Sequence, residues 1–140
     1  MERTLVLIKP QMFIDHRDVV ANGANAITAY YWAKGLGIVG HFQFRFSVEM
    51  ATRFYQEHVG KPFFAGLIEA MTCDDCIALI VGGDDAVNKV REINGATDPR
   101  KALPGTIRHK YGRMESGPYN AVHGSDSPES AEREIKIIFG

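Results

Sequence analysis

A titratable ring and several small polar side chains gather in the short stretch from Asn120 through His123 to Ser127. The apolar residues before His123 predict a short strand with the histidine at its end. Ser127 and Pro128 then predict the start of a helix, as its N-cap and first residue. Backbone N–H groups at such a turn attract anions, and histidine can be neutral, nucleophilic and reprotonated near pH 7. The pattern indicates nucleophilic chemistry on an anion; the alternative is a turn histidine that only packs or hydrogen-bonds.

Three cationic residues lie where they could hold phosphate groups. Lys9 follows a predicted strand, Arg91 lies in a predicted helix, and Arg108 follows a Pro-Gly turn. Phosphoryl transfer requires positive charge around the phosphates and a positioned nucleophile. Taken singly, each of these cations is more often a solvated surface charge.

Strands and helices that must position these residues alternate along the chain. Apolar and β-branched runs predict strands at residues 4–8, 38–46, 76–81 and 119–122. Periodicity and N-caps at Ser47 and at Asp84 or Asp85 predict helices at residues 26–34, 47–58, after Lys61-Pro62, 84–93 and 128–137. Residues 11–25 are predicted to be irregular, with a turn at Asn22-Gly23, and residues 94–118 to form a long functional loop. The order fits either a parallel Rossmann sheet or a ferredoxin-like sheet.

Composition is that of an ordinary globular protein. The 140 residues suffice for one domain with a real core and are too few for two. The 16 Lys and Arg against 17 Asp and Glu give no basic excess that would indicate nucleic acid or a membrane surface. The sequence contains no signal-peptide pattern, no apolar run of about 18 residues, and too few cysteines for a disulfide framework. We expect a cytoplasmic protein that forms a single domain over residues 1–140, with no membrane or specific nucleic acid as partner.

Two further motifs, a glycine pattern and a cysteine pair, are not expected to be functional because of the elements around them. The glycines at positions 35, 37 and 40 match the pattern G-x-G-x-x-G, but they follow a predicted helix and open a strand, the reverse of a dinucleotide site. Cys73 and Cys76 have no further ligands at zinc spacing. A strand, rather than a helix N-terminus that lowers a thiol pKa, follows the pair, so a redox role is not expected.

Several blocks of sequence together resemble the nucleoside diphosphate kinase family. The stretch Asn120-x-x-His123-Gly-Ser-Asp-Ser resembles the active-site signature of that family, in which the histidine carries the phosphoryl group between nucleotides. The other matching blocks are Thr-Leu-Val-Leu-Ile-Lys-Pro at 4–10, Gly-Lys-Pro-Phe-Phe-Ala-Gly-Leu at 60–67, Val-Asn-Lys-Val-Arg at 87–91, Asn-Gly-Ala-Thr-Asp-Pro at 94–99 and Pro-Gly-Thr-Ile-Arg at 104–108. Their order and spacing are far more specific than any single block.

This resemblance implies a fold and a set of site residues. The fold would be α+β, a ferredoxin-like four-stranded antiparallel sheet covered by helices. The implied catalytic residues are His123 as nucleophile, Glu134 holding the other ring nitrogen, and Ser125 near the transferred group. The implied nucleotide-binding residues are Lys9, Arg91, Thr97 and Arg108 for the phosphates, Lys9 and Asn120 for the ribose, Tyr55 beside the phosphates, and Phe63 stacked on the base with Leu67 beneath it. From residue type alone, Phe63 would be read as core and Glu134 as a solvated helix residue.

The implied activity is ping-pong transfer of a γ-phosphoryl group from a nucleoside triphosphate to a nucleoside diphosphate through phosphohistidine. The implied cofactor is Mg²⁺ carried by the nucleotide, with no dedicated protein ligands beyond a water-mediated contact to Asp126. A homo-oligomer, either a hexamer or a tetramer, is also implied. The chain departs from the family pattern at Gln11, where an Asp is usual, at His109-Lys110, and in the length of residues 11–25. These departures keep open a regulatory or binding protein of the same fold with weak catalysis.

Overall fold

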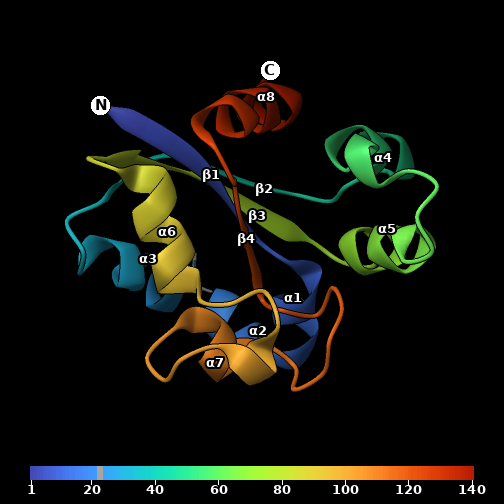
Figure 1. Ribbon diagram of the computed structural model, residues 1–140, viewed down its shortest axis with the longest axis horizontal. Helices are drawn as coiled ribbons and strands as arrows, with labels where there is room; N and C mark the ends of the chain where they lie inside the picture. Colours follow the sequence, from blue (N-terminus) through green and yellow to red (C-terminus); the bar gives the residue numbers. More distant parts are fainter. Residues whose placement is uncertain (22–23) are drawn as a thin grey trace.

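Four strands form one sheet in the order β2-β3-β1-β4, and all neighbouring strands are antiparallel (Figure 1). The computed structural model describes residues 1–21 and 24–140, so the turn predicted at Asn22-Gly23 lies outside the described residues. The strands are β1 (Glu2–Ile8), β2 (Gly37–Phe44), β3 (Cys76–Gly83) and β4 (Val122–Gly124). The antiparallel pairing excludes the Rossmann alternative and confirms the predicted ferredoxin-like α+β fold.

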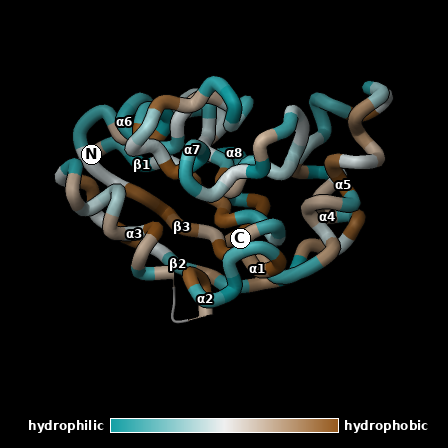
Figure 2. The backbone as a smooth tube through the Cα atoms, turned by 90° about the horizontal axis from the view of Figure 1, so that it is seen from below, coloured by the Kyte–Doolittle hydropathy of each residue, from teal (hydrophilic) through white to brown (hydrophobic). Residues whose placement is uncertain are grey.

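Strands β1 and β3 lie at the centre because their side chains are apolar on both faces. Val6 and Ile8 belong to one apolar cluster, whereas Leu5 and Leu7 belong to a second cluster on the opposite face. This alternation follows from the two-residue period of a strand. In Figure 2, β3 is hydrophobic along most of its length. Both faces of the sheet therefore require a cover.

Helices cover both faces. The first cluster includes residues of α1 (Pro10–Asp15), α2 (Arg17–Val20), α3 (Asn25–Trp32), α6 (Ala86–Asn94) and α7 (Ile107–Tyr111). The second cluster includes residues of α4 (Val48–Phe54), α5 (Phe64–Thr72) and α8 (Pro128–Phe139). Two short 3-10 helices, η1 (Gln56–His58) and η2 (Pro99–Lys101), complete the structure described. Within residues 1–21 and 24–140, every helix is too short or too polar to cross a membrane.

Two of the three predicted helix caps are confirmed. Ser47 accepts a hydrogen bond from the Met50 N–H and Ser127 accepts one from the Ser130 N–H, each at 3.0 Å. Asp85 stands at the N-cap position of α6, but its side chain accepts from the Asn88 amide at 2.9 Å and from no backbone N–H of the first turn, so the predicted capping bond is wrong. Instead the carboxylate of Glu2 accepts from the Val87 N–H at 2.9 Å. A partner 85 positions away in the sequence could not be read from the local pattern.

The segment predicted to be irregular at 11–25 is largely helical. It holds α1 and α2 and leads into α3, and Gln11, Met12 and Phe13 of α1 are buried. Helices of six and four residues carry too few turns for a periodic pattern. Residues 94–118 likewise contain η2 and α7, the latter capped by Thr106 through the His109 N–H at 3.3 Å. Tertiary packing stabilises these short helices.

The fourth strand begins three residues later than predicted. Residues 119–121 are outside the sheet, and β4 pairs His123 with Leu7 of β1. Ala121 has φ +70°, a left-handed conformation that cannot continue a strand. His123 therefore sits within β4 and beside the central strand.

Both rejected motifs behave as ordinary structure. Gly35, at φ +80°, follows α3, and Gly37 opens β2, as predicted for a glycine pattern that binds no dinucleotide. Cys73 and Cys76 are free thiols. Burial raises the pKa of both thiols, most strongly at Cys76, which is the opposite of what a reactive thiolate needs.

Candidate active site

One cavity of about 1160 Å³ collects side chains from separate parts of the chain. All but one of the predicted site residues line it: Lys9, Tyr55, Phe63, Leu67, Arg91, Thr97, Arg108, Asn120, His123 and Glu134. The exception is Ser125. The lining divides into a cationic end, formed by Lys9, Arg91, Arg108 and His123, and an aromatic end, formed by Tyr55, His58, Phe63 and Leu67.

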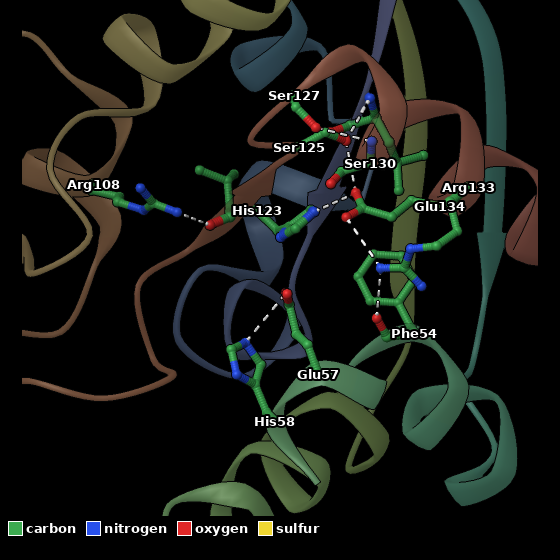
Figure 3. A network of polar contacts seen from close by, with 12 residues as sticks. Phe54, Glu57, His58, Arg108, His123, Ser125, Ser127, Ser130, Arg133 and Glu134 are labelled. Carbon is green, nitrogen blue, oxygen red and sulfur yellow. Dashed lines mark hydrogen bonds and ion pairs between the residues drawn. The ribbon is translucent and has the colours of Figure 1, made fainter. Parts of the chain in front are cut away.

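His123 is oriented by a buried carboxylate. Its Nε2 lies 2.8 Å from Oε1 of Glu134, whose side chain is 7% exposed (Figure 3). Ser127 and Pro128 start α8 so that Glu134 faces back toward β4. An imidazole that donates from Nε2 to a carboxylate keeps its lone pair on Nδ1. Within the part of the chain that the structure describes, Nδ1 has no hydrogen-bond partner.

Ser125 lies behind this pair rather than beside the open nitrogen. Its hydroxyl donates to Glu134 Oε1 at 2.7 Å, and its backbone N–H donates to the Leu5 carbonyl at 3.1 Å. The side chain is fully buried. In Figure 3, Ser125 lies above Glu134, whereas Arg108 lies on the far side of His123. Its contacts suit a residue that positions Glu134, not one that meets the transferred group.

Lys9 is a buried cation without a carboxylate partner. Its Nζ lies 2.7 Å from Oδ1 of Asn120 and 3.2 Å from the Pro118 carbonyl, and only 6% of the residue is exposed. Burial, helped by the positive charge of Arg108, lowers the pKa of Lys9 to about 7. Amide and carbonyl oxygens solvate an ammonium but do not neutralise it. An anion in the cavity would stabilise its charged form.

Arg108 is fixed by the backbone around it. Its guanidinium donates to the carbonyls of Gly95, Asn120 and Val122 at 2.8, 3.2 and 2.7 Å. Burial is the main cause that lowers its pKa to about 10. A guanidinium has five N–H groups, so some remain free after these three bonds. Arg108 thus joins the turn after α6 to β4 and still brings charge to the cavity.

The remaining polar residues at this end are more exposed. Arg91, in the last turn of α6, and Thr97 both line the cavity, and the Thr97 carbonyl accepts from the amide of Asn120 at 3.0 Å. Among residues 1–21 and 24–140, neither Lys9 nor Arg91 nor Arg108 forms an ion pair with a carboxylate. The cationic end therefore presents three positive side chains that have no direct ion-pair partner among the described residues, which favours an anionic ligand.

The aromatic end is open and apolar. The Phe63 ring is 53% exposed although it is large and hydrophobic, and Leu67 beside it is buried. An exposed aromatic face beside a cavity can stack on a planar ligand. The Tyr55 hydroxyl is buried without a hydrogen-bond partner in the structure, and burial raises its pKa far above the ordinary value. A buried donor left unpaired is costly, and a ligand oxygen that reached this hydroxyl would remove that cost.

Sequence reasoning missed His58. Its ring packs edge-on against Phe63, with 5.2 Å between centroids, and lies near Tyr55 at 6.2 Å. The spacing Tyr-x-x-His was the available signal, since residues three apart share one helical face. Gln11 was also missed as a contact of the His123 segment, and no local pattern could have revealed it.

No group of three or more His, Cys, Asp or Glu side chains in the described residues could hold a metal ion. Asp126 is the carboxylate closest in sequence to His123, and it lines the cavity. A hydrogen bond from Ser130 is the main cause that lowers the Asp126 pKa, and Arg91 adds to it. A cation at this site would therefore need most of its ligands from another molecule.

An antiparallel α+β sheet that carries a carboxylate-oriented histidine beside unpaired cations defines a protein of the phosphotransferase class. A family model described as nucleoside diphosphate kinase matches residues 2–140. The chain belongs to the nucleoside diphosphate kinase family.

Individual relatives agree with this membership. The chain is 49% identical to a nucleoside diphosphate kinase of Staphylothermus marinus, covering 99% of this chain and 92% of the relative. It is 46% identical to that of Pyrococcus furiosus, covering 99% of this chain and 83% of the relative. Among solved structures, it is similar to the Aquifex aeolicus enzyme, with a TM-score of 0.87, 38% identity, and coverage of 99% of this chain and 95% of that one. It is also similar to the Halobacterium salinarum enzyme, solved in complex with CDP, with a TM-score of 0.84, 39% identity, and coverage of 99% and 87%. By family and relatives, the chain is a nucleoside diphosphate kinase, a transferase of nucleotide metabolism.

Proposed function

We propose that phosphoryl transfer in this protein proceeds in two half-reactions through Nδ1 of His123. In the first, the Nδ1 lone pair attacks the γ-phosphorus of a nucleoside triphosphate. An N–P bond forms, the bond to the bridging oxygen breaks, and the nucleoside diphosphate leaves with that electron pair. In the second, a terminal oxygen of another nucleoside diphosphate attacks the same phosphorus and restores the free imidazole. One site then serves donor and acceptor in turn.

The contact between His123 and Glu134 is the observation that carries this proposal. Because Nε2 points at the carboxylate at 2.8 Å, the nucleophilic lone pair belongs to Nδ1. The ring gains positive character as the N–P bond forms, and the nearby carboxylate stabilises that charge. Ser125 restrains the same carboxylate oxygen from behind.

The cationic end would bind the phosphates. Lys9, Arg91 and Arg108, with the hydroxyls of Thr97 and Tyr55, supply donors to phosphate oxygens, and Lys9 and Asn120 also supply contacts to the ribose. Charge-assisted hydrogen bonds of this kind are among the strong ones. Phosphate binding would return Lys9 to its ammonium form, because its pKa of about 7 reflects a buried charge that lacks an anion.

The aromatic end would take the base. Phe63 offers a ring face and Leu67 an apolar support, and neither reads the hydrogen-bonding edge of a base. Stacking of this kind tolerates every base, because each has a π-face. We therefore propose that purine and pyrimidine nucleoside di- and triphosphates all bind; the halophilic relative was solved with CDP.

Magnesium would enter with the nucleotide. The donor set of the described residues fits this, since it offers the ionised carboxylate of Asp126 for a water-mediated contact but no carboxylate cage. When bound, the metal neutralises charge on the phosphate oxygens. The protein residues orient the histidine and clamp the phosphates.

We further propose that residues 1–140 act as one domain in a homo-oligomer, either a hexamer or a tetramer. Support comes from the free edge of β2, which has Val39 and Phe42 exposed, because unpaired edges are usually covered. Sedimentation velocity measures the oligomeric state. We expect the cytoplasm as the compartment, where nucleotides abound and thiols such as Cys73 stay reduced.

Labelling the protein with γ-labelled ATP and magnesium tests the mechanism. The wild type should retain one acid-labile, base-stable label per chain, and GDP or CDP should remove it. His123→Gln keeps a polar side chain without the nucleophile, so it should take up no label and lose on the order of 10⁴-fold in exchange rate. Label that persists in His123→Gln would falsify the assignment.

A further inference from the structure

A strained turn precedes the histidine. The Val122 N–H donates to the Asn120 carbonyl at 2.8 Å, which closes a three-residue turn centred on Ala121. Ala121 has φ +70° although it carries a Cβ and is fully buried. Three-residue turns with a positive central φ are rare and strained. A residue persists in this state only where its surroundings hold it.

Gln11 restrains Ala121 in this conformation. Its Oε1 accepts from the Ala121 N–H at 2.8 Å, and the Gln11 side chain is buried. The Lys9 N–H donates to the Ala121 carbonyl at 2.9 Å. Both backbone groups of Ala121 are therefore taken by the two residues that flank Pro10.

Gln11 is itself fixed through its amide N–H groups. They donate to the Tyr111 carbonyl at 2.9 Å and to Asp15 at 3.0 Å. Asp15 forms a two-pronged ion pair with Arg113, at 2.8 and 3.0 Å. Arg113 in turn lies 4.3 Å over the ring of Tyr119, and its backbone N–H donates to the Tyr119 carbonyl. These contacts link Gln11, through Asp15 and Arg113, to Tyr119, which lies just before the strained turn.

We propose that Gln11 is a positioning residue for phosphoryl transfer, which holds Ala121 in its left-handed conformation and thereby sets how His123 meets Glu134. The inference rests on the proposed function, since it concerns the geometry of the nucleophile. Without the Gln11 acceptor, the Ala121 N–H would be buried and unpaired, and the turn would relax toward φ below zero. The ring of His123, two residues on, would then leave the line to Glu134.

The test compares Gln11→Ala with Met12→Ala, a matched control that removes a fully buried side chain from the next position of α1. We measure three quantities: the single-turnover rate of phosphoenzyme formation, the Kd for ADP, and the ¹⁵N chemical shifts of the His123 ring, assigned with His123→Gln. Gln11→Ala should slow phosphoenzyme formation by about 10²-fold, as a displaced reacting group does. Its Kd for ADP should change much less, and the His123 nitrogens should lose the tautomer with the proton on Nε2. Met12→Ala should lower the melting temperature and leave rate and shifts near those of wild type.

A second variant covers the case in which Gln11→Ala does not fold. Gln11→Met fills about the same space but offers no acceptor oxygen to the Ala121 N–H. It should change the His123 shifts and slow phosphoenzyme formation as Gln11→Ala does. Equal rates and shifts in Gln11→Ala and Met12→Ala, or wild-type rate and shifts in Gln11→Met, would overturn the proposal. Because wild type and His123→Gln report separately on the phosphoenzyme, such a result leaves the proposed function standing.

Discussion

The two ends of the cavity are built in opposite ways. At the cationic end, Lys9, Arg108 and His123 are each held by hydrogen bonds of 3.2 Å or less to buried or partly buried groups. At the aromatic end, Phe63 is more than half exposed, and its contacts are the ring of His58 and the side chain of Lys61. At the first end, hydrogen bonds fix the orientation of the side chains. At the second, an aromatic ring face is open to a ligand.

The difference matches the two demands of the reaction. Transfer to a nucleophile requires reacting groups held in one geometry, and polar contacts supply direction. Use of many nucleotides requires a site that binds the base without hydrogen bonds to its edge. An apolar ring face meets this requirement, because it can stack on any base. Damage at the cationic end should therefore lower the rate for all substrates, whereas damage at the aromatic end should lower affinity for all bases.

Changing the carboxylate behind the histidine should have the largest effect. Glu134→Gln keeps the size of the side chain but removes the charge that fixes the tautomer of His123. We expect kcat to fall by about 10²- to 10³-fold, as when one preorganised polar group is lost, with KM changed far less. Steady-state exchange between ATP and GDP measures both. A kcat within threefold of wild type would mean that the charge of Glu134 is not needed to orient the His123 ring.

Arg108 and Arg91 have different roles at the cationic end. Arg108 holds backbone carbonyls as well as offering charge to a ligand, whereas Arg91 only offers charge. Arg108→Ala should cost about 1.5–3 kcal/mol in transition-state stabilisation. It should also lower the melting temperature, because three backbone carbonyls lose their donor. Arg91→Ala, at an exposed position, should weaken nucleotide binding with little change in melting temperature. Thermal denaturation beside kcat/KM measurements distinguishes them, and equal thermal shifts would contradict the structural role of Arg108.

Truncating the aromatic ring tests the other end. Phe63→Ala should weaken binding of all nucleoside diphosphates by about 1–3 kcal/mol, with kcat at saturation changed less. Titration calorimetry with ADP, GDP and CDP gives the comparison, and Trp32→Ala, an exposed ring on α3 outside the cavity, is the matched control. A loss confined to one base would show that the aromatic end recognises the hydrogen-bonding edge of that base.

The smallest effect concerns the charge of Lys9. Its pKa is about 7 in the folded protein and near 10.5 in the unfolded chain, so above pH 7 the unfolded chain holds the proton that the fold has lost. Stability should therefore rise with pH from about pH 7 to about pH 8.5, by at most about 1.4 kcal/mol per unit. Urea denaturation without nucleotide measures the slope, and Lys9→Met should flatten it. A slope identical in both proteins would mean that Lys9 is not the group responsible.

Sequence predicted the parts of the molecule that depend on local pattern. The unbroken apolar run of β1 and the caps at Ser47 and Ser127 were accessible in this way. For the cavity the order and spacing of several blocks were decisive, since Lys9 or Phe63 alone has an ordinary structural explanation.

Parts that depend on distant partners were not predictable. Glu2 caps α6, Ser125 supports Glu134, and Gln11 bonds Ala121, and each contact joins residues whose proximity only the fold creates. The short helices α1 and α2 were missed for the same reason, because they are stabilised by packing against each other and against α5 and α3 rather than by propensity.

The pairing of β1 has a consequence for how the protein folds during synthesis. β1 lies between β3 and β4, so Ile8 pairs with Ile77 on one side and Val6 with Gly124 on the other. Sheets built from such distant pairings fold slowly, since a long loop must close before any pairing is rewarded. The first hundred residues to be synthesised contain three of the four strands, but neither β4 nor α8. The nucleophile His123 and its partner Glu134 are therefore among the last residues to join the sheet and its cover.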